Sequence, residues 1–512
     1  MAKLPDWRGN LRLMALVGLA LLLDITWLTT PHPPLSVLQF LAEHGNIAAA
    51  LLHGQGFADP FGTPSGPTAW VPPVFPLYLA AVFLVFGIKT AAALRALLAL
   101  DCVWAAISVF FLSALLDLSG HPRVKPWLAT VLVALTLLHQ QALGPWLYTN
   151  WFIAAFDAAF LAAGVGVLTS GRSGWWWLLA LTGAIIPATH AGSGLACFVV
   201  VLGVWFLLAR RAAGSGLPLR RAVVHTARRP LLVLAAFALP TGAWTVRNQL
   251  VFHQWIPIKS AGWFEVYLAQ AYTTDGVIDN ATITAHHPYS NPQLLVEYTR
   301  RGEAAFLADY QPKAQALLAA DPWEFVHGIL GRARSIFSYS DTASHIFMAR
   351  TPMSHTDALR LVEAGLASRF TEPMPVYWTS LMLDRAEFSG RLDQLRLENP
   401  DAIRRDWLAA RTQMQKEARQ PARVLSGLAL ACLPVACLLG VFALQRLRTD
   451  PALVLAAVFY FVAVLPNVLI THYSSHQLHY LALHALFIVS FGAALWKCFG
   501  EIHAGLHPPC PS

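Results

Sequence analysis

Charged side chains are scarce in this 512-residue chain, where Asp, Glu, Lys and Arg together make up only 12% of the residues. Soluble domains carry roughly 25% charged residues, and hydrophobic residues here reach 56%. The composition excludes an ordinary soluble protein. It predicts an all-α polytopic membrane protein, because a helix satisfies its own backbone groups inside lipid.

The long polar segment 251–421 also has no excess of positive charge, which a nucleic-acid-binding domain would need. The formal net charge is +8, yet residues 251–421 contain 17 Lys or Arg against 19 Asp or Glu. The basic surplus therefore lies in the short loops of the rest of the chain. Such loops are typical of the cytoplasmic side of a membrane protein, so we expect no nucleic-acid partner.

Cysteines and nucleotide-binding motifs are similarly few. The six cysteines form no CxxC motif and none lies within 251–421, which excludes a disulfide framework. The chain contains no GxxxxGK[ST], GxGxxG, HExxH or GxSxG motif. We therefore expect no use of ATP, and any group that is transferred should arrive on a lipid or another preactivated carrier.

Long apolar runs fill most of the remaining sequence. A membrane-spanning helix needs roughly 20 apolar residues. We predict about ten spans, at residues 11–30, 90–113, 127–143, 151–169, 175–190, 192–209, 230–250, 422–445, 451–470 and 477–497. The run at 74–88 is shorter and opens on prolines, which favours an interfacial helix over a further span.

The positions of the basic loops predict the orientation. With the N-terminus inside and 74–88 not crossing, every strongly basic loop lies in the cytoplasm, including the arginine-rich loop 210–229. Both termini are then cytoplasmic, in a multi-pass protein of a bacterial inner membrane. The predicted layout is an N-terminal transmembrane module (1–250) with a first external loop (31–89), an extracytoplasmic segment (251–421) and C-terminal transmembrane helices (422–512).

The extracytoplasmic segment has mainly helical periodicity and should form a mostly helical cap. Asp321, Pro322 and Glu324 form a helix-start signal, with a capping carboxylate and a proline in the first turn. A charged helix is expected near 400–420. The only strand signal is 275–285, which could be a loop or a short hairpin.

Ionisable residues inside the apolar spans are costly and need partners or a function. They are Asp24, Arg95, Asp101, His139, Asp157, His190 and Arg247. Hydrogen bonding between neighbouring helices is the simpler explanation for the aspartates, and a proton or ion pathway is the alternative.

Glu43 and Asp59 are the two carboxylates of the first external loop. A carboxylate held just outside the membrane could deprotonate an acceptor, although a solvated loop residue would have the same sequence. His476 and His479 lie three residues apart at a helix start and could bind a phosphate or a metal, or could anchor the interface. Arg247 could bind a phosphate through its forked guanidinium, or it could simply reach the membrane surface.

Three stretches carry a family resemblance: AEHGNIAAALLHGQGF, WVPPVFPLYLAAVFLVFGIKTAAALRALLA and ALPTGAWTVRNQLVFHQWIPIKS. Together with the order of elements, they resemble the membrane glycosyltransferases of the C superfamily, which include protein O-mannosyltransferases and aminoarabinose-transferase-like proteins. The chain departs from the family pattern at Ala42, where a second acidic residue is usual, and at Asn150, where an aspartate is usual.

The resemblance implies that a sugar is transferred from a polyprenyl-phosphate donor on the outer side of the membrane, with Glu43 as the catalytic base. It assigns the donor phosphate to Arg95, Arg247, His476 and His479, and the substrate lining to Asp59, Trp70, Tyr148 and Asn150. Membrane lipids are the other expected partners. The acceptor is left open between a lipid, a glycan and a protein. No cofactor is implied with certainty, and a divalent metal ion is left open. The alternative is a non-catalytic relative that acts as a transporter, a flippase or an assembly scaffold.

Overall fold

The computed structural model describes residues 4–24, 42–143, 150–278, 282, 286–289, 291–338, 451–470, 472–473, 480 and 482–490. These residues are mostly helical, as the apolar periodicity predicts, and the part described contains a single pair of two-residue strands. Four of the described helices are long and apolar enough to cross a membrane: α4 (Ala91–Leu118), α6 (Asn150–Ser170), α8 (Ala191–Ala213) and α10 (Arg228–Phe252). They match the spans predicted at 90–113, 151–169, 192–209 and 230–250.

The other six predicted spans are not established in this way. Residues 422–445 lie outside the described residues. Three further segments form the helices α1 (Trp7–Asp24), α5 (Lys125–Leu143) and α7 (Ser173–Ile185). Near the C-terminus lie α22 (Pro451–Leu469) and a helical stretch at 482–490. The total of ten spans therefore stays a prediction.

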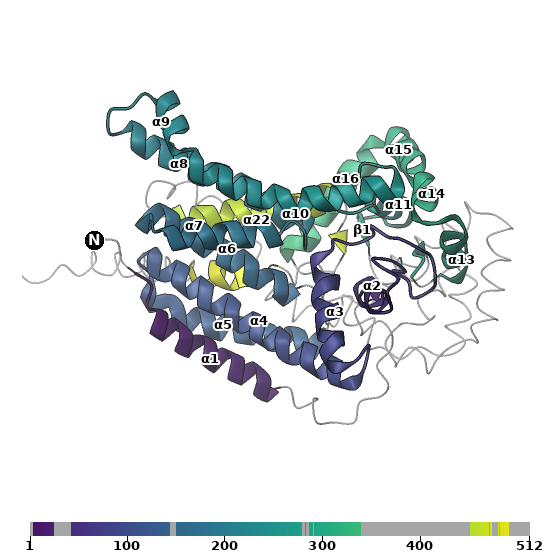
Figure 1. The fold of residues 1–512 in the computed structure, drawn as a ribbon, viewed down its shortest axis with the longest axis horizontal. Coiled ribbons are helices and arrows are strands. Elements are labelled where there is room, and N and C mark those ends of the chain that lie inside the picture. The colour runs from purple at the N-terminus through teal and green to yellow at the C-terminus, as the bar shows by residue number, and fades with distance from the viewer. Residues whose placement is uncertain are drawn as a thin grey trace, which may run out of the picture.

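The long helices form a bundle with α6 at its centre (Figure 1). Nearly every residue of α6 is buried, because Ala and Gly along its length let neighbouring helices approach closely. A Cβ on Gly166 would lie 2.3 Å from the ring of Trp175 on α7. The close approach of α6 and α7 therefore requires a glycine at this position.

A carboxylate is buried within this bundle and is bonded to a neighbouring helix. The Ser193 hydroxyl at the start of α8 donates to Asp157 Oδ2 of α6 at 2.9 Å. The backbone amide of Ser193 also donates to His190 Nδ1 at 3.2 Å. The prediction that Asp157 hydrogen-bonds between helices is therefore confirmed.

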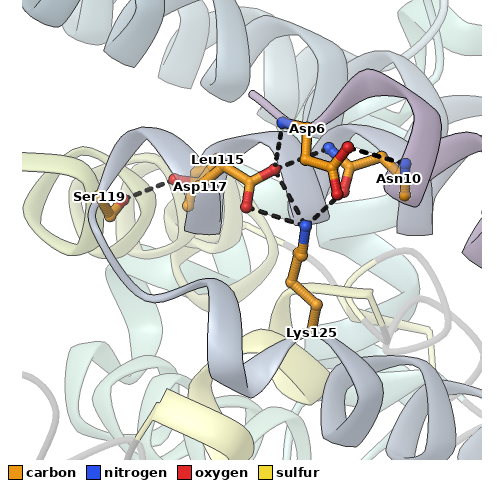
Figure 2. Close-up of polar contacts among 7 residues, drawn as sticks. Asp6, Asn10, Leu115, Asp117, Ser119 and Lys125 are labelled. Carbon is orange, nitrogen blue, oxygen red and sulfur yellow. Dashed lines mark hydrogen bonds and ion pairs between the residues drawn. The ribbon is translucent and has the colours of Figure 1, made fainter. Parts of the chain in front are cut away.

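One end of the bundle is closed by a buried polar cluster around Asp117, near the C-terminal end of α4 (Figure 2). The Asp117 carboxylate accepts bonds from the Asp6 backbone amide and from Asn10 Nδ2, both at 3.0 Å. Lys125 Nζ lies 2.9 Å from Asp117 Oδ1 and donates to Asn10 Oδ1 at 2.9 Å. The cluster therefore ties α1, α4 and α5 together.

Replacing Asp117 with alanine should lower the unfolding free energy by about 3–5 kcal/mol, because the variant leaves a buried Lys125 cation without its counter-ion. The change would be measured as a fall in the thermal midpoint of the purified protein. Asp309→Ala is the control, since it removes a carboxylate from an exposed pair with Arg301, and such surface pairs contribute little to stability. Equal midpoints for the two variants would contradict the structural role of Asp117.

The opposite end of the bundle carries the first loop and the helices of residues 262–338. Figure 1 shows α9 (Leu219–Thr226) at one end and the helices of the first loop and of residues 262–338 at the other. At that second end lie α2 (Ala42–Leu52), α3 (Val74–Phe86), α11 (Gly262–Tyr272), α13 (Pro292–Arg301), α14 (Glu303–Ala308), α15 (Tyr310–Ala320) and α16 (Pro322–Ser338). With 13 residues, α3 is shorter than a span requires, which agrees with the prediction of an interfacial helix at 74–88.

The start of α16 also matches its sequence signal. Asp321 Oδ1 accepts hydrogen bonds from the backbone amides of Trp323 at 3.0 Å and Glu324 at 2.9 Å, and Pro322 is the first helical residue. The sequence therefore located this helix start to the residue. The helix predicted at 400–420 lies outside the described residues.

The segment 275–285, predicted as a loop or a short hairpin, is described at 275–278 and at 282. Val277 and Ile278 form β1, whose partner is β2 (His472–Tyr473) in parallel register. Arg332 of α16 fixes the junction, since its guanidinium donates to Val468 O at 2.8 Å and to Gly276 O at 3.4 Å. A partner almost 200 residues away could not be predicted from local turn signals.

Candidate functional site

Glu43 lies in the first turn of α2, with its side chain partly buried. The helix continues with Ile47, one turn further on, so the two side chains lie on the same face of α2. Ile47 is fully buried in a largely aromatic cluster formed by the first loop and residues 261–310. We call this cluster the junction core, and its buried members are Ile47, Phe61, Trp70, Val71, Ala261, Phe264, Leu268, Ala269, Ile278, Tyr298, Phe306 and Tyr310. Glu43 therefore sits at the edge of the junction core.

The environment of Glu43 raises the pKa of its carboxyl group from 4.5 to about 7. Loss of solvation is the main cause, because burial disfavours the charged form. A hydrogen bond from its own backbone lowers the pKa, the negative charge of Glu265 raises it and the positive charge of Lys259 lowers it. Glu43 is therefore a carboxyl group that changes its charge near neutral pH, which is typical of a catalytic acid or base.

Lys259 and Glu265 form an ion pair beside Glu43. Lys259 Nζ is 2.7 Å from each carboxylate oxygen of Glu265, on the first turn of α11. The Glu265 side chain is buried, whereas 32% of the Lys259 side chain is exposed. The ammonium group is thus held in place, and part of the Lys259 side chain is exposed.

The backbone on both sides of Lys259 is also fixed. Trp244 Nε1 of α10 donates to Ile258 O at 2.8 Å, and the Ser260 amide donates to Ala69 O of the first loop at 2.9 Å. The cation is therefore positioned by α10, α11 and the first loop together. Such preorganisation lowers the cost of ordering a side chain when a ligand binds.

Glu303, the first residue of α14, joins the first loop to α13 and to Ser260. Its buried carboxylate accepts bonds from the Ala69 amide at 2.7 Å, the Ser260 hydroxyl at 2.7 Å and the Tyr298 hydroxyl at 2.8 Å, as well as from the Thr68 hydroxyl. Burial raises the pKa of Glu303, while these four donors lower it. With its oxygens occupied by structural donors, Glu303 serves to hold the junction together.

Arg247 has a comparable structural role at the end of α10. Its guanidinium donates to Thr68 O at 2.7 Å and to Phe57 O at 3.0 Å, both in the first loop. It also donates to Asn248 Oδ1 at 2.9 Å and lies 4.9 Å from the ring centre of Trp244. These contacts favour a clamp on the first loop over the predicted contact with a donor phosphate, because the fork is already engaged.

Among the other predicted site residues that the structure describes, Asp59 and Trp70 have structural contacts of their own. Arg95 is exposed in the second turn of α4, and no hydrogen bond or ion pair joins it to another described residue. Asp59 has a left-handed backbone and closes its own loop by accepting from the Ser65 and Gly66 amides. Trp70 is buried in the junction core, 4.9 Å from the ring centre of Phe61. These positions favour packing or loop-closing roles for Asp59 and Trp70.

Asn150 begins α6 and is buried, and its Oδ1 atom has no hydrogen-bond partner among the described residues. Tyr148, His476 and His479 lie outside the described residues. The assignments of these four residues to the lining and to the donor phosphate therefore stay predictions.

No metal centre emerges from the part of the chain that the structure describes, where no group of three His, Cys, Asp or Glu side chains is arranged to hold an ion. The negative charge of Glu265 and the positive charge of Lys259 both act on Glu43. Lys259 already pairs with the Glu265 carboxylate.

Lys259, Glu265 and Glu303 belong to the site but carry no signal in the sequence that predicts this. Lys259 is the second-last residue of the stretch ALPTGAWTVRNQLVFHQWIPIKS, and the family-like pattern does not mark it as functional. Glu265 and Glu303 are spaced like ordinary surface residues of amphipathic helices. Only the folded chain reveals that both are buried.

Comparison of the chain with protein-family models, with curated proteins and with solved structures found no match.

Proposed function

We propose that this protein is an integral-membrane glycosyltransferase, which transfers a sugar from a polyprenyl-phosphate donor to an acceptor outside the cytoplasm. The observation that carries the proposal is Glu43, a partly buried carboxyl group with a pKa of about 7 beside a preorganised lysine. A general base works best when its pKa is close to the working pH. The resemblance of the first loop to glycosyltransferases of the C superfamily points to the same residue.

In the proposed reaction, the Glu43 carboxylate takes the proton of the acceptor. The acceptor atom then attacks the anomeric carbon of the sugar and forms the new glycosidic bond. The bond between that carbon and the phosphate oxygen breaks, and its electron pair leaves with the polyprenyl phosphate. Protonated Glu43 returns its proton to water, which completes the cycle without an oxidant or a reductant.

Lys259 is the cation best placed to receive the charge that develops on the leaving phosphate. Its charge already acts on Glu43, and about a third of its side chain is exposed. A fixed positive group near a developing negative charge stabilises the transition state more than the ground state. Arg247, by contrast, has its guanidinium bonded to carbonyl oxygens of the first loop.

The proposed orientation places the junction core on the extracytoplasmic side of a bacterial inner membrane. Support comes from the bundle, in which the basic loop around α9 lies at the end opposite to α2 and α11 (Figure 1). Arginines gather on the cytoplasmic side of membrane proteins. Both termini would then be cytoplasmic. The proposal includes the ten membrane spans and a cap formed by residues 251–421 outside the cytoplasm.

The test is a sugar-transfer assay of the purified protein in lipid nanodiscs, with a panel of radiolabelled polyprenyl-phosphate sugars and lipid acceptors. At least one donor should give a glycosylated product, and the rate should rise with pH through about 7 and then level off, because only ionised Glu43 accepts a proton. A rate that falls as the pH rises through this range would contradict a basic role for Glu43. Lack of product from every donor would favour a non-catalytic membrane protein.

A further inference from the structure

A basic surface lies at the end of the bundle where α9 connects α8 to α10 (Figure 1). Two arginines stand in the first turn of α9 and two more in the first turn of α10, and all four are exposed. Their guanidinium groups form no hydrogen bond or ion pair with any residue that the structure describes. We call these residues the arginine patch: Arg220, Arg221, Arg228 and Arg229.

The neighbouring sequence supplies no negative charge to balance the arginine patch. Residues 158–264 contain no Asp or Glu, so neither α9 nor α10 has an acidic residue in its first turn. The helix dipole makes the start of a helix unfavourable for a cation, and neighbouring arginines repel one another. The arginine patch is therefore suited to an anionic partner from outside the chain.

One face of α9 is fixed against α8. Ala222, in the middle of α9, is fully buried, and Trp205 Nε1 of α8 donates to Val223 O at 3.1 Å. Because successive residues of a helix are about 100° apart, Arg220 and Val224 lie on the side of α9 opposite Ala222. The Val224 side chain is 72% exposed. The outward face of α9 therefore combines a cation with an apolar side chain.

Other large apolar side chains are exposed beside the arginine patch. They are Leu217, Leu219, Leu231 and Leu232. Leucines interleaved with arginines are typical of a helix in a membrane interface, where apolar groups enter the acyl region and guanidinium groups stay among the headgroups. Both α8 and α10 are long and apolar enough to span a membrane. The short connection between them therefore belongs at a membrane surface.

We propose that the arginine patch binds the headgroups of anionic phospholipids, with α9 lying in the membrane surface. The phosphate of such a lipid carries the negative charge that the neighbouring sequence lacks, and its acyl chains cover the exposed leucines. A soluble anion would satisfy the arginines alone. Clusters of four or more basic residues beside a membrane-spanning helix recognise anionic lipids in this way. The inference does not depend on the proposed function.

The test measures lipid binding to the full-length protein in a neutral detergent by native mass spectrometry. The probes are phosphatidylglycerol, which is anionic, and phosphatidylcholine, which has no net charge. The test variant combines Arg220→Gln, Arg221→Gln, Arg228→Gln and Arg229→Gln. The control variant removes the same number of exposed arginines from other segments, by combining Arg8→Gln, Arg12→Gln, Arg123→Gln and Arg172→Gln.

The wild-type protein should bind phosphatidylglycerol more tightly than phosphatidylcholine. The test variant should bind phosphatidylglycerol about a hundredfold more weakly, because each of the four cations contributes to the attraction. The control variant should differ from the wild type by less than about threefold, since distant exposed charges are screened by salt. Without lipid, the thermal midpoint of the test variant should equal or exceed that of the wild type, because the repulsion between the arginines is gone.

Three results would overturn the proposal. Equal losses of affinity in the two variants would show that total charge attracts the lipid, and unchanged binding by the test variant would show that the arginine patch has no part in it. Displacement of phosphatidylglycerol by the same concentration of glycerol 3-phosphate would assign the arginines to a soluble anion.

Two double variants keep the test decisive if the test variant loses its thermal transition. They are Arg220→Gln with Arg221→Gln, and Arg228→Gln with Arg229→Gln. Each should weaken the binding of phosphatidylglycerol about tenfold. Unchanged binding by both double variants would overturn the proposal.

Discussion

Replacement of Glu43 with glutamine should lower the rate of sugar transfer by about 10²–10⁴-fold, the usual contribution of a general base. Glutamine has nearly the same shape but cannot accept the proton of the acceptor. The loss should appear in kcat, while the KM for the donor changes little, because Lys259 and its bonds to Glu265 remain. Transfer assays at pH 8 with saturating donor measure the effect.

The same replacement should stabilise the protein at high pH. Folded Glu43 keeps its proton up to about pH 7, whereas the unfolded chain releases it near 4.5. The folded state therefore binds more protons between these values, and its stability falls as the pH rises through this window. Above pH 7 the ionised carboxylate costs the wild-type protein about 3 kcal/mol, and a neutral glutamine avoids that cost.

Thermal midpoints at pH 5 and pH 8 test this prediction. Glu43→Gln should exceed the wild-type midpoint at pH 8 and approach it at pH 5, while the control Glu324→Gln, at an exposed position of α16, should differ little at either pH. A variant that is inactive but more stable is expected where a residue is placed for function. If Glu43→Gln instead lowered the midpoint at both values, the loss of activity would reflect misfolding.

Replacement of Glu303 with alanine should be the most destabilising change in the junction, at about 3–5 kcal/mol. The variant leaves without an acceptor the donors from Thr68, Ala69, Ser260 and Tyr298, and it removes the negative charge that acts on Arg247. Because these donors belong to three separate segments, the first loop should come loose from α13 and α14.

Two measurements apply to Glu303→Ala. The thermal midpoint should fall by several degrees, and limited proteolysis should cut within 53–67 faster than in the wild-type protein. Glu297→Ala is the matched control, because Glu297 lies six residues earlier, is 39% exposed and forms only a surface pair with Arg301. A midpoint for Glu303→Ala within one degree of the control would show that the carboxylate does not hold the junction.

Much of the helical architecture could be predicted from local sequence. The spans at 90–113, 151–169, 192–209 and 230–250 needed only length and hydrophobicity, and the start of α16 needed only Asp321 and Pro322. These features depend on interactions within a few residues. The same is true of the short α3 helix, whose length and prolines set it apart from a span.

The residues of the candidate site are held in position by contacts between segments far apart in the chain, which local sequence patterns do not reveal. Arg247 looked like a phosphate ligand because a guanidinium near a membrane surface suits one, yet its partners are carbonyls some 180–190 residues earlier. Lys259 gained its position from Ala69 and Trp244, which lie on different elements. Local sequence does not reveal burial, so nothing distinguishes Glu265 and Glu303 from surface carboxylates before the chain is folded.

Titration of Glu43 itself is the most direct test of its role as a base. Infrared difference spectra between the wild-type protein and Glu43→Gln, recorded in nanodiscs across pH, isolate the carboxyl band of this one residue without donor or acceptor. The band of the neutral acid should disappear and that of the carboxylate should appear with a midpoint near pH 7. A carboxylate that is fully ionised at pH 5.5 would contradict the proposal that Glu43 is a base tuned to neutral pH.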